Sequence, residues 1–184
     1  MAKLESLHYV DFSCQGEVSK DVIEEVARHV HAFNREHGNA LGLDFPAWAP
    51  GQQFSDAVQI RVLGEAEPLG VFLRQPRAIR LLALGEVART AVTKVPLGSG
   101  IPTVAVVRDT SAEKTKPSHA RRRAARGLPA FDGKHAKSQF SISFTSKSTG
   151  QSFLLKLKKR VVERLQEVQF NSYGVCASGG VPQF

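Results

Sequence analysis

The sequence predicts an α+β protein in which a β-α-β-β-α-β unit is followed by a basic half with an arginine-rich helix and a β-hairpin. Two observations lead to this prediction. In the first hundred residues, short strand-like runs are interrupted by two stretches with helical spacing of apolar residues. The charge then rises sharply, since residues 1–100 contain 10 Lys and Arg against 12 Asp and Glu, and residues 101–184 contain 15 against 5.

The first unit contains the clearest helix of the chain, expected at residues 18–36. Its apolar residues recur at steps of three and four, and they are Val22, Ile23, Val26, Val30 and Phe33. Gly38 follows where a left-handed residue commonly ends a helix. We expect the other elements of this unit to be strands at 8–12, 41–45 and 57–63, a second helix at 65–74, and extended segments at 79–84 and 88–95.

This order of elements is the ferredoxin-like arrangement, which many RNA-binding modules share. We therefore expect residues 1–97 to form a ferredoxin-like domain, joined to the second half by the Gly- and Pro-containing stretch 97–102. The arrangement hosts many functions, so it predicts no activity by itself.

Residues 98–184 form the expected basic half. We expect a strand at 103–107 that ends at Arg108, and a helix at about 117–126 that begins near Pro117 and ends at Gly127. A hairpin is expected at about 138–158, with Phe140, Ile142 and Phe144 alternating on its first strand. Residues 161–168 fit a strand or a helix equally well, and a Gly-rich tail follows.

The composition narrows the class of protein. The hydrophobic content of 42% suits a packed globular chain, and there is no run of 18 apolar residues that would cross a membrane. The first residues lack the apolar core of a signal peptide. The two isolated cysteines, Cys14 and Cys176, fit inert thiols in a reducing compartment, so we expect a cytoplasmic protein.

No cofactor is expected, and no metal site. The histidines and cysteines do not show the spacing of metal ligands. His29 and His31 are separated by one residue on the expected helix, so their side chains point in different directions.

A near-neutral half joined to a strongly basic half indicates a polyanionic partner. A solvated basic face is the simpler alternative. A membrane surface is disfavoured, because the basic residues do not accompany a long amphipathic helix with large apolar anchors.

The expected helix at 117–126 concentrates this charge. One of its faces gathers His119, Arg122, Arg123 and Arg126. No apolar stripe lies opposite, and so short a helix is marginal alone in water. Its arginines therefore point to phosphate groups of a partner.

The loop of the hairpin has the residues to hold a phosphodiester. Its sequence is Ser146-Lys147-Ser148-Thr149-Gly150-Gln151-Ser152-Phe153, which offers hydroxyl groups, a glycine turn and an aromatic ring. RNA can be cleaved without a metal when a base takes the proton of the 2′-OH and the nucleophile is held in line with the adjacent phosphate. Six histidines are available as the base, and they are His8, His29, His31, His37, His119 and His135.

Two motifs carry a family resemblance. The pattern S-x-S-T-G-Q-x-F in the loop, followed by Tyr173-Gly174 and a G-G-x-V-P-x-F ending, resembles the CRISPR-associated endoribonucleases of type I-F systems. Those enzymes cut precursor CRISPR RNA at the base of a repeat hairpin. Their catalytic histidine lies on the first helix, seven residues before a glycine, with a strand ending in Phe-Pro beyond it. His31 occupies that position relative to Gly38, and Phe45-Pro46 follows.

The resemblance implies roles for further residues. Ser146 would hold the 2′-OH nucleophile beside His31, and Tyr173 would lie near the site and place His31. Ser148 and Thr149 would contact the RNA backbone, and Phe153 would stack on the terminal base pair of the stem. Arg108 would read bases of the lower stem, with Thr110 where the family pattern has a longer polar side chain. The expected helix at 117–126 would lie in the groove of the RNA hairpin, where it would contribute Arg121, Arg122, Arg123 and Arg126.

The implied partners are a CRISPR RNA repeat stem-loop and the other subunits of a surveillance complex, in which the protein would stay bound to the cleaved stem-loop. The implied products carry a 5′-hydroxyl and a 2′,3′-cyclic or 3′-phosphate. Two alternatives remain at this point: a hairpin-binding subunit without catalysis, and a general or ribosome-associated RNA-binding protein.

Overall fold

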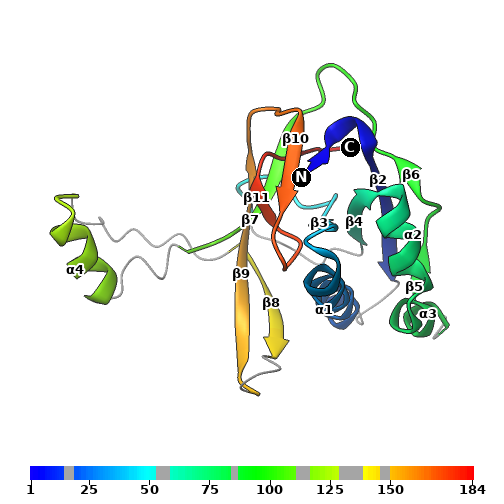
Figure 1. The fold of residues 1–184 in the computed structure, drawn as a ribbon, viewed down its shortest axis with the longest axis horizontal. Helices are drawn as coiled ribbons and strands as arrows, with labels where there is room; N and C mark the ends of the chain where they lie inside the picture. The colour runs from blue at the N-terminus through cyan, green and yellow to red at the C-terminus, as the bar shows by residue number, and fades with distance from the viewer. Residues whose placement is uncertain (15–18, 53–58, 84–86, 111–116, 129–138, 146–149) are drawn as a thin grey trace.

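The computed structural model describes residues 1–14, 19–52, 59–83, 87–110, 117–128, 139–145 and 150–184. In these parts it is a mixed α+β structure with four α-helices and three antiparallel sheets (Figure 1). The helices are α1 (Ser19–His37), α2 (Ala66–Arg74), α3 (Pro76–Ala83) and α4 (Pro117–Ala125), and a 3-10 turn covers Leu4–Ser6.

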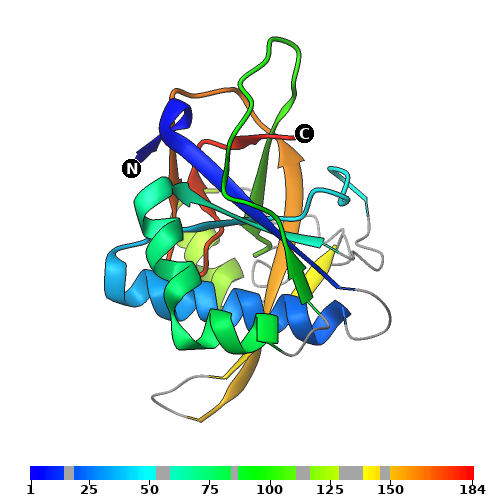
Figure 2. The same ribbon diagram turned by 90° about the vertical axis from the view of Figure 1, so that its right-hand side faces the viewer.

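The first half contributes all the strands of the five-stranded sheet. Its strands run in the order β3-β4-β2-β5, and β6 also pairs with β2. These strands are β2 (Leu7–Cys14), β3 (Gly42–Asp44), β4 (Gln59–Glu65), β5 (Val87–Arg89) and β6 (Thr93–Lys94). One face of the sheet packs on α1 and α2 through the apolar side chains Val10, Phe12, Ile60 and Val62, and Phe12 meets Phe72 of α2. Figure 2 shows α1 running across the lower part of the molecule.

The second half supplies the other two sheets except for β1, which comes from the start of the chain. The four-stranded sheet has the order β12-β7-β9-β8 and the three-stranded sheet has the order β1-β10-β11. The strands are β1 (Ala2–Lys3), β7 (Thr103–Arg108), β8 (Phe140–Thr145), β9 (Ser152–Val161), β10 (Glu167–Phe170), β11 (Cys176–Ser178) and β12 (Val181–Pro182). The hairpin β8–β9 extends past α1 at its far end (Figure 2).

Most of the expected elements are confirmed where the structure describes them. The long helix ends as expected, because Gly38 has a φ of 76° and its N–H donates to Asn34 O at 3.0 Å. The arginine-rich helix α4 ends in the same way at Gly127, with a φ of 64°. Residues 161–168, whose sequence fits a strand or a helix, contain the end of β9, an irregular connection and the start of β10.

The expectation of an extended segment at 79–84 is wrong over its described part, because residues 76–83 form α3. Pro76 occupies the first helical position, where its missing N–H costs nothing. Ala78 is buried, and Leu81 and Leu82 pack against the core. A short apolar run can belong to either a strand or a helix, and here packing against α1 and α2 favours the helix. Leu84 lies outside the described residues.

A buried ion pair joins the two halves. Lys159 of β9 is fully buried, and its Nζ lies 2.8 Å from Oδ1 of Asp44 on β3 and donates to Phe45 O at 2.9 Å. The Asp44 side chain is only 1% exposed, and its Oδ2 has no hydrogen-bond partner among the described residues. The Lys159 ammonium group is therefore the principal compensation for the carboxylate charge.

This pair gives a first prediction. Lys159→Met leaves the Asp44 charge buried and uncompensated, and breaking a buried pair in this way costs about 3–5 kcal/mol. We expect the free energy of unfolding, measured by urea denaturation, to fall by that amount. The double variant Asp44→Asn with Lys159→Met should recover most of the loss. A single variant as stable as the wild type would show that the pair does not hold the halves together.

Candidate active site

The site expected around His31 is formed where α1 meets the turn before β11. The imidazole Nδ1 of His31 donates its hydrogen to the backbone oxygen of Ser172 at 2.8 Å, because a carbonyl oxygen can only accept. In a neutral ring this leaves Nε2 as the nitrogen with a free lone pair. Within the described residues Nε2 has no hydrogen-bond partner. His31 thus has the tautomer that can accept a proton at Nε2.

Tyr173 lies directly on this ring. The two rings are parallel within 3°, and their centroids are 4.3 Å apart. The sequence prediction that Tyr173 lies near His31 agrees with this contact. Together, the stacking and the Ser172 hydrogen bond restrict both the tilt and the rotation of the imidazole.

The turn that carries Ser172 and Tyr173 is itself anchored to α1 and β3. Asn34, one turn after His31, donates to Leu41 O at 2.8 Å and to Asn171 O at 3.3 Å. Gly174 has a φ of 77°, and a Cβ there would lie 3.0 Å from Val30 and 2.9 Å from Leu43, so a larger residue does not fit. Asn34 and Asn171 were missed by the sequence analysis. The buried polar position of Asn34 on an apolar helix face was the available signal.

The end of the hairpin completes the surroundings of His31. Phe144 of β8 meets the His31 ring edge-on at 5.6 Å between centroids, and it stacks on Phe153 of β9 at 5.8 Å. Phe153 also meets Tyr173 edge-on at 6.2 Å and remains 39% exposed. The structure therefore brings together three of the predicted site residues, His31, Tyr173 and Phe153, around the buried side chain of Phe144.

The three hydroxyl-bearing candidates of the loop, Ser146, Ser148 and Thr149, lie outside the described residues. Their flanks are described: β8 ends at Thr145, β9 begins at Ser152, and the hydroxyl oxygens of these two residues are 3.3 Å apart. Thr145 and Ser152 are the residue pair that follows Phe144 and Phe153 in the hairpin, and Phe144 is the ring that contacts His31.

The hairpin is also bonded to the helix that carries His31. Glu24 of α1 accepts a hydrogen bond at 3.1 Å from the backbone N–H of Ser143, on the edge strand β8. An edge N–H without a partner in the protein would need water, so this bond satisfies it. It also fixes the position of the hairpin along the axis of α1.

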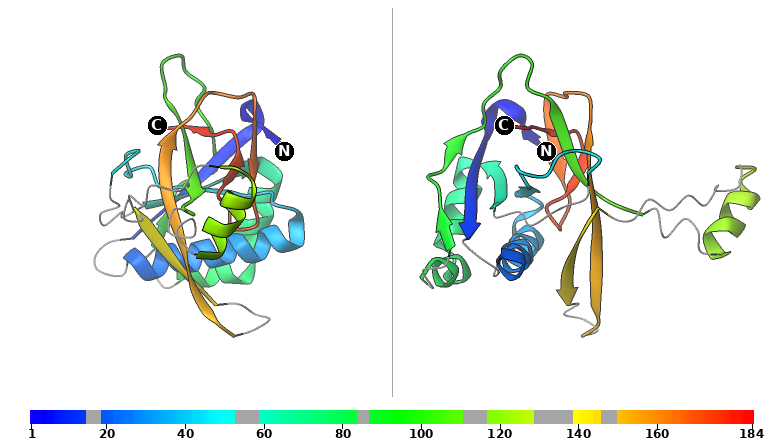
Figure 3. Two further views of the ribbon diagram at one scale, coloured as in Figure 1. Left: turned by 90° about the vertical axis from the view of Figure 1, so that its left-hand side faces the viewer. Right: turned by 180° about the vertical axis from the view of Figure 1, so that it is seen from behind.

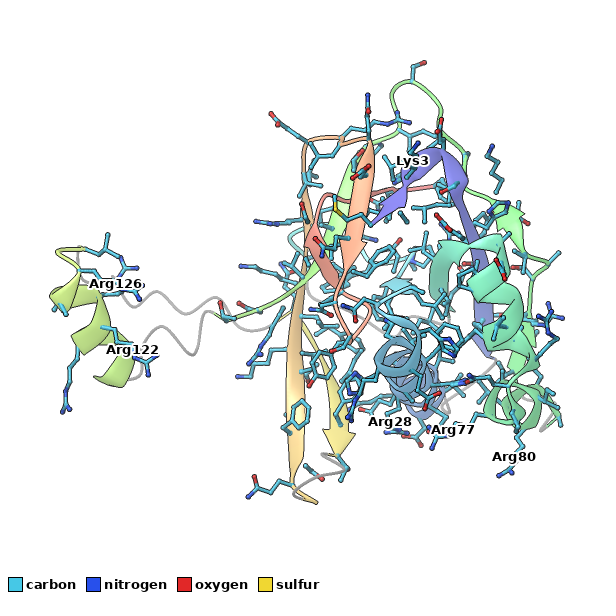
Figure 4. All side chains as sticks on the ribbon, viewed as in Figure 1. Lys3, Arg28, Arg77, Arg80, Arg122 and Arg126 are labelled. Atoms are coloured by element: carbon cyan, nitrogen blue, oxygen red, sulfur yellow. The ribbon has the colours of Figure 1, made fainter. Side chains whose placement is uncertain are left out.

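The other predicted residues lie on β7 and α4. Arg108 ends β7 and is exposed, and Thr110 follows it after the buried Asp109. On α4, Arg121 and Arg122 are exposed and Arg123 is partly exposed, and the exposed Arg126 follows the last residue of the helix, Ala125. The side chain of His119 lies outside the described part. Figure 3 shows α4 on the side of the four-stranded sheet that faces away from α1, and Figure 4 labels Arg122 and Arg126 there.

His29 has a different role from its neighbour on α1. Its side chain is buried against Phe72, with ring centroids 4.3 Å apart, and its Nε2 lies 2.6 Å from Gln75 Oε1. Burial lowers the pKa of His29, and the nearby Arg77 charge lowers it further. The hydrogen bond to Gln75 raises it, but by less than burial lowers it. His29 is thus a neutral core residue.

Cys176 is buried and free of any disulfide. Burial, together with the nearby Asp44 charge, raises the pKa of its thiol to about 12. The thiol is therefore protonated at neutral pH, which confirms the expectation of an inert cysteine for Cys176. The side chain of Cys14 is outside the described part.

Comparison with known families identifies the chain. The sequence model of the family "CRISPR-associated protein (Cas_Csy4)" matches residues 9–184, which is nearly the whole length. The chain therefore belongs to the Cas_Csy4 family, the type I-F CRISPR RNA-processing endoribonucleases, and the resemblance seen in the sequence is confirmed. Membership implies binding and processing of CRISPR RNA in a type I-F system.

A search of curated protein sequences gave no significant match. Among the described residues, no helix has the length and apolar character needed to span a membrane.

The buried His29 gives a second prediction. Its folded-state pKa lies below the value of about 6.5 expected in the unfolded chain, so the unfolded chain binds the extra proton first as the pH falls. The stabilisation from neutral His29 is complete above that pH and is lost below it. The Tm should drop between about pH 7.5 and about pH 5.5, and His29→Met should show a smaller drop. Equal drops in both proteins would contradict this assignment.

Proposed function

We propose that the protein is a metal-independent endoribonuclease that cleaves precursor CRISPR RNA at the base of the repeat stem-loop. The setting of His31 is the observation that carries the proposal. Its Nδ1–H is donated to Ser172 O at 2.8 Å, and its ring is stacked on Tyr173 beside the hairpin end. A general base needs a fixed position and a free lone pair, and the ring geometry supports both.

The proposed reaction is an intramolecular displacement at phosphorus. His31 Nε2 takes the proton of the 2′-OH, O2′ forms a bond to the adjacent phosphorus, and the bond from phosphorus to O5′ breaks. The leaving oxygen takes up a proton and becomes a 5′-hydroxyl, while the other fragment ends in a 2′,3′-cyclic phosphate. Family membership supports RNA cleavage by this chain, and the geometry around His31 supports a general base in that step.

The loop residues would hold the reacting groups. We propose that Ser146 orients the 2′-OH beside His31, and that Ser148 and Thr149 contact the backbone near the scissile phosphate. Phe153, partly exposed on β9, would stack on the terminal base pair of the stem. Tyr173 would act as a positioning residue for His31.

The arginine-rich helix would hold the stem. We propose that Arg121, Arg122, Arg123 and Arg126, with His119, enter the groove of the RNA hairpin from one end. The short α4 carries no apolar stripe, so phosphate contacts would order it. Arg108 would read a base of the lower stem through a bidentate contact, with Thr110 beside it.

The fold is proposed to be ferredoxin-like over residues 1–97, with residues 98–184 as the RNA-binding half. The element order from β2 to β5 and the strand order β3-β4-β2-β5 support this arrangement. The halves share a core, since Ile142, Phe144 and Leu155 of the hairpin pack in the same cluster as residues of α1. After cleavage the protein would keep the stem-loop and remain a subunit of the surveillance complex.

Cleavage of a repeat hairpin in EDTA tests the proposal. Wild type should cut at the base of the stem, and His31→Ala should slow cleavage by about 10²–10⁴-fold while binding is retained, because only the base is lost. His37→Ala is the matched control, since His37 lies on the same helix and is exposed at its end.

Three outcomes would contradict the proposal. Binding by wild type without cutting would favour a hairpin-binding subunit, and normal cutting by His31→Ala would remove the assigned base. Equal affinity for a scrambled hairpin would favour a general RNA-binding protein.

A further inference from the structure

A row of three basic side chains lies on the outer face of β9. Lys156, Lys158 and Arg160 are alternate residues, so they point to the same face of the strand. Lys156 and Arg160 are exposed, and Lys158 is partly exposed. The residues between them, Leu157 and Lys159, point to the other face and are buried. We call Lys156, Lys158 and Arg160 the basic row.

The strands beside the basic row do not neutralise it. Lys156 lies opposite Ser141 of β8, Lys158 opposite Val107 of β7, and Arg160 opposite Ala105 of β7. Within the described part of the chain, the one ion pair of the row runs from Lys158 Nζ to Asp109 Oδ1, at 4.0 Å, and the Lys158 side chain is 39% exposed. A pair this long and this exposed to solvent holds the lysine weakly.

The basic row faces the same side of the molecule as the arginine-rich helix. In Figure 3, β9 lies between α1 on one side and α4 on the other. The buried Leu157, on the opposite face of β9 from the row, belongs to the core cluster that residues of α1 also form. The row begins three residues after Phe153 on the same strand, on the opposite face of β9 from the Phe153 side chain, and runs away from the hairpin end. Consecutive side chains on one face of a strand are about 7 Å apart. The row is thus a line of positive charge that starts near the proposed stacking position.

We propose that the basic row binds backbone phosphates of the RNA stem on the side of the duplex that faces the sheet, while α4 holds the groove on the other side. This inference rests on the proposed function, because it takes the base of the stem to lie at Phe153. A stem that is held both at the end of the hairpin and by α4 would lie against the outer face of β9, because α4 is on that side of the strand. The row contacts the backbone alone, so it contributes affinity and position and reads no base.

The salt dependence of binding tests this assignment. We compare wild type with the triple variant Lys156→Ala, Lys158→Ala and Arg160→Ala, using a fluorescent repeat hairpin with a 2′-deoxy nucleotide at the cleavage position to prevent turnover. Each lost phosphate contact lowers the slope of log K against log salt by about 0.7–0.9, so the slope should fall by about 2–3. Affinity at moderate salt should fall at least about tenfold. The single-turnover cleavage rate of unmodified RNA at saturating protein should fall much less than the affinity.

The matched control is Arg77→Ala, Arg80→Ala and Arg89→Ala, which removes the same charge from α3 and β5. These three residues are exposed, and Figure 4 shows Arg77 and Arg80 at the end of the molecule away from α4. The control should keep the wild-type slope. The pair Arg122→Ala and Arg126→Ala should lower the slope, and its effect on the binding free energy should add to that of the row, because the two surfaces are separate.

The outcomes separate the inference from the proposed function. If wild type binds and cuts the hairpin and the row variant keeps the wild-type slope and affinity, the row does not contact RNA. If the row variant and the control lose equal affinity, the effect is one of net charge, and the inference is also overturned. If the row variant binds normally but cuts slowly, the row acts at the reaction and not on the stem. If wild type neither binds nor cuts the hairpin, the proposed function is wrong, and the inference about the basic row is overturned with it.

Discussion

The attachment of the β8–β9 hairpin to α1 and β3 is the constraint on which the rest of the structure depends. The buried pair between Lys159 and Asp44, with Lys159 also bonded to Phe45 O, fixes the hairpin against the first sheet. Glu24 adds a bond from α1 to the edge of β8. The helix contributes His31 and the hairpin carries the hydroxyl-rich loop. The two parts of the proposed active site are therefore held together by buried polar contacts more than a hundred residues apart in sequence.

The position of the His31 side chain is likewise fixed by contacts within the fold. The parallel Tyr173 ring and the Ser172 carbonyl restrict the imidazole. Asn34 of α1 bonds both to the turn that carries them and to Leu41, the residue before β3. A general base prepositioned in this way would not need to be ordered when RNA arrives. Its neighbour His29 shows the contrast on one helix: a buried histidine that packs on Phe72 and serves the core.

Local sequence signals predicted much of the fold. The apolar spacing of α1, its glycine end and the alternation of β8 and β9 are short-range patterns, so they were found without knowledge of tertiary contacts. α3 was predicted as extended because its apolar run is short and its neighbours decide its conformation. The Asp44–Lys159 pair and the Asn34–Asn171 contact could not be predicted, because each depends on how distant segments pack. Among the site residues, His31 was selected from six histidines only by family resemblance, and its contact with Tyr173 is a property of the fold.

The central claim is that this site uses the RNA's own 2′-OH as the nucleophile. The most direct test is a repeat hairpin with a single 2′-deoxy substitution at the nucleotide 5′ to the scissile phosphate, assayed in EDTA beside the unmodified RNA. The account predicts that wild-type protein binds both RNAs with similar affinity and cuts only the unmodified one, leaving a 2′,3′-cyclic phosphate. Cleavage of the deoxy-substituted RNA at the same position and rate would contradict it.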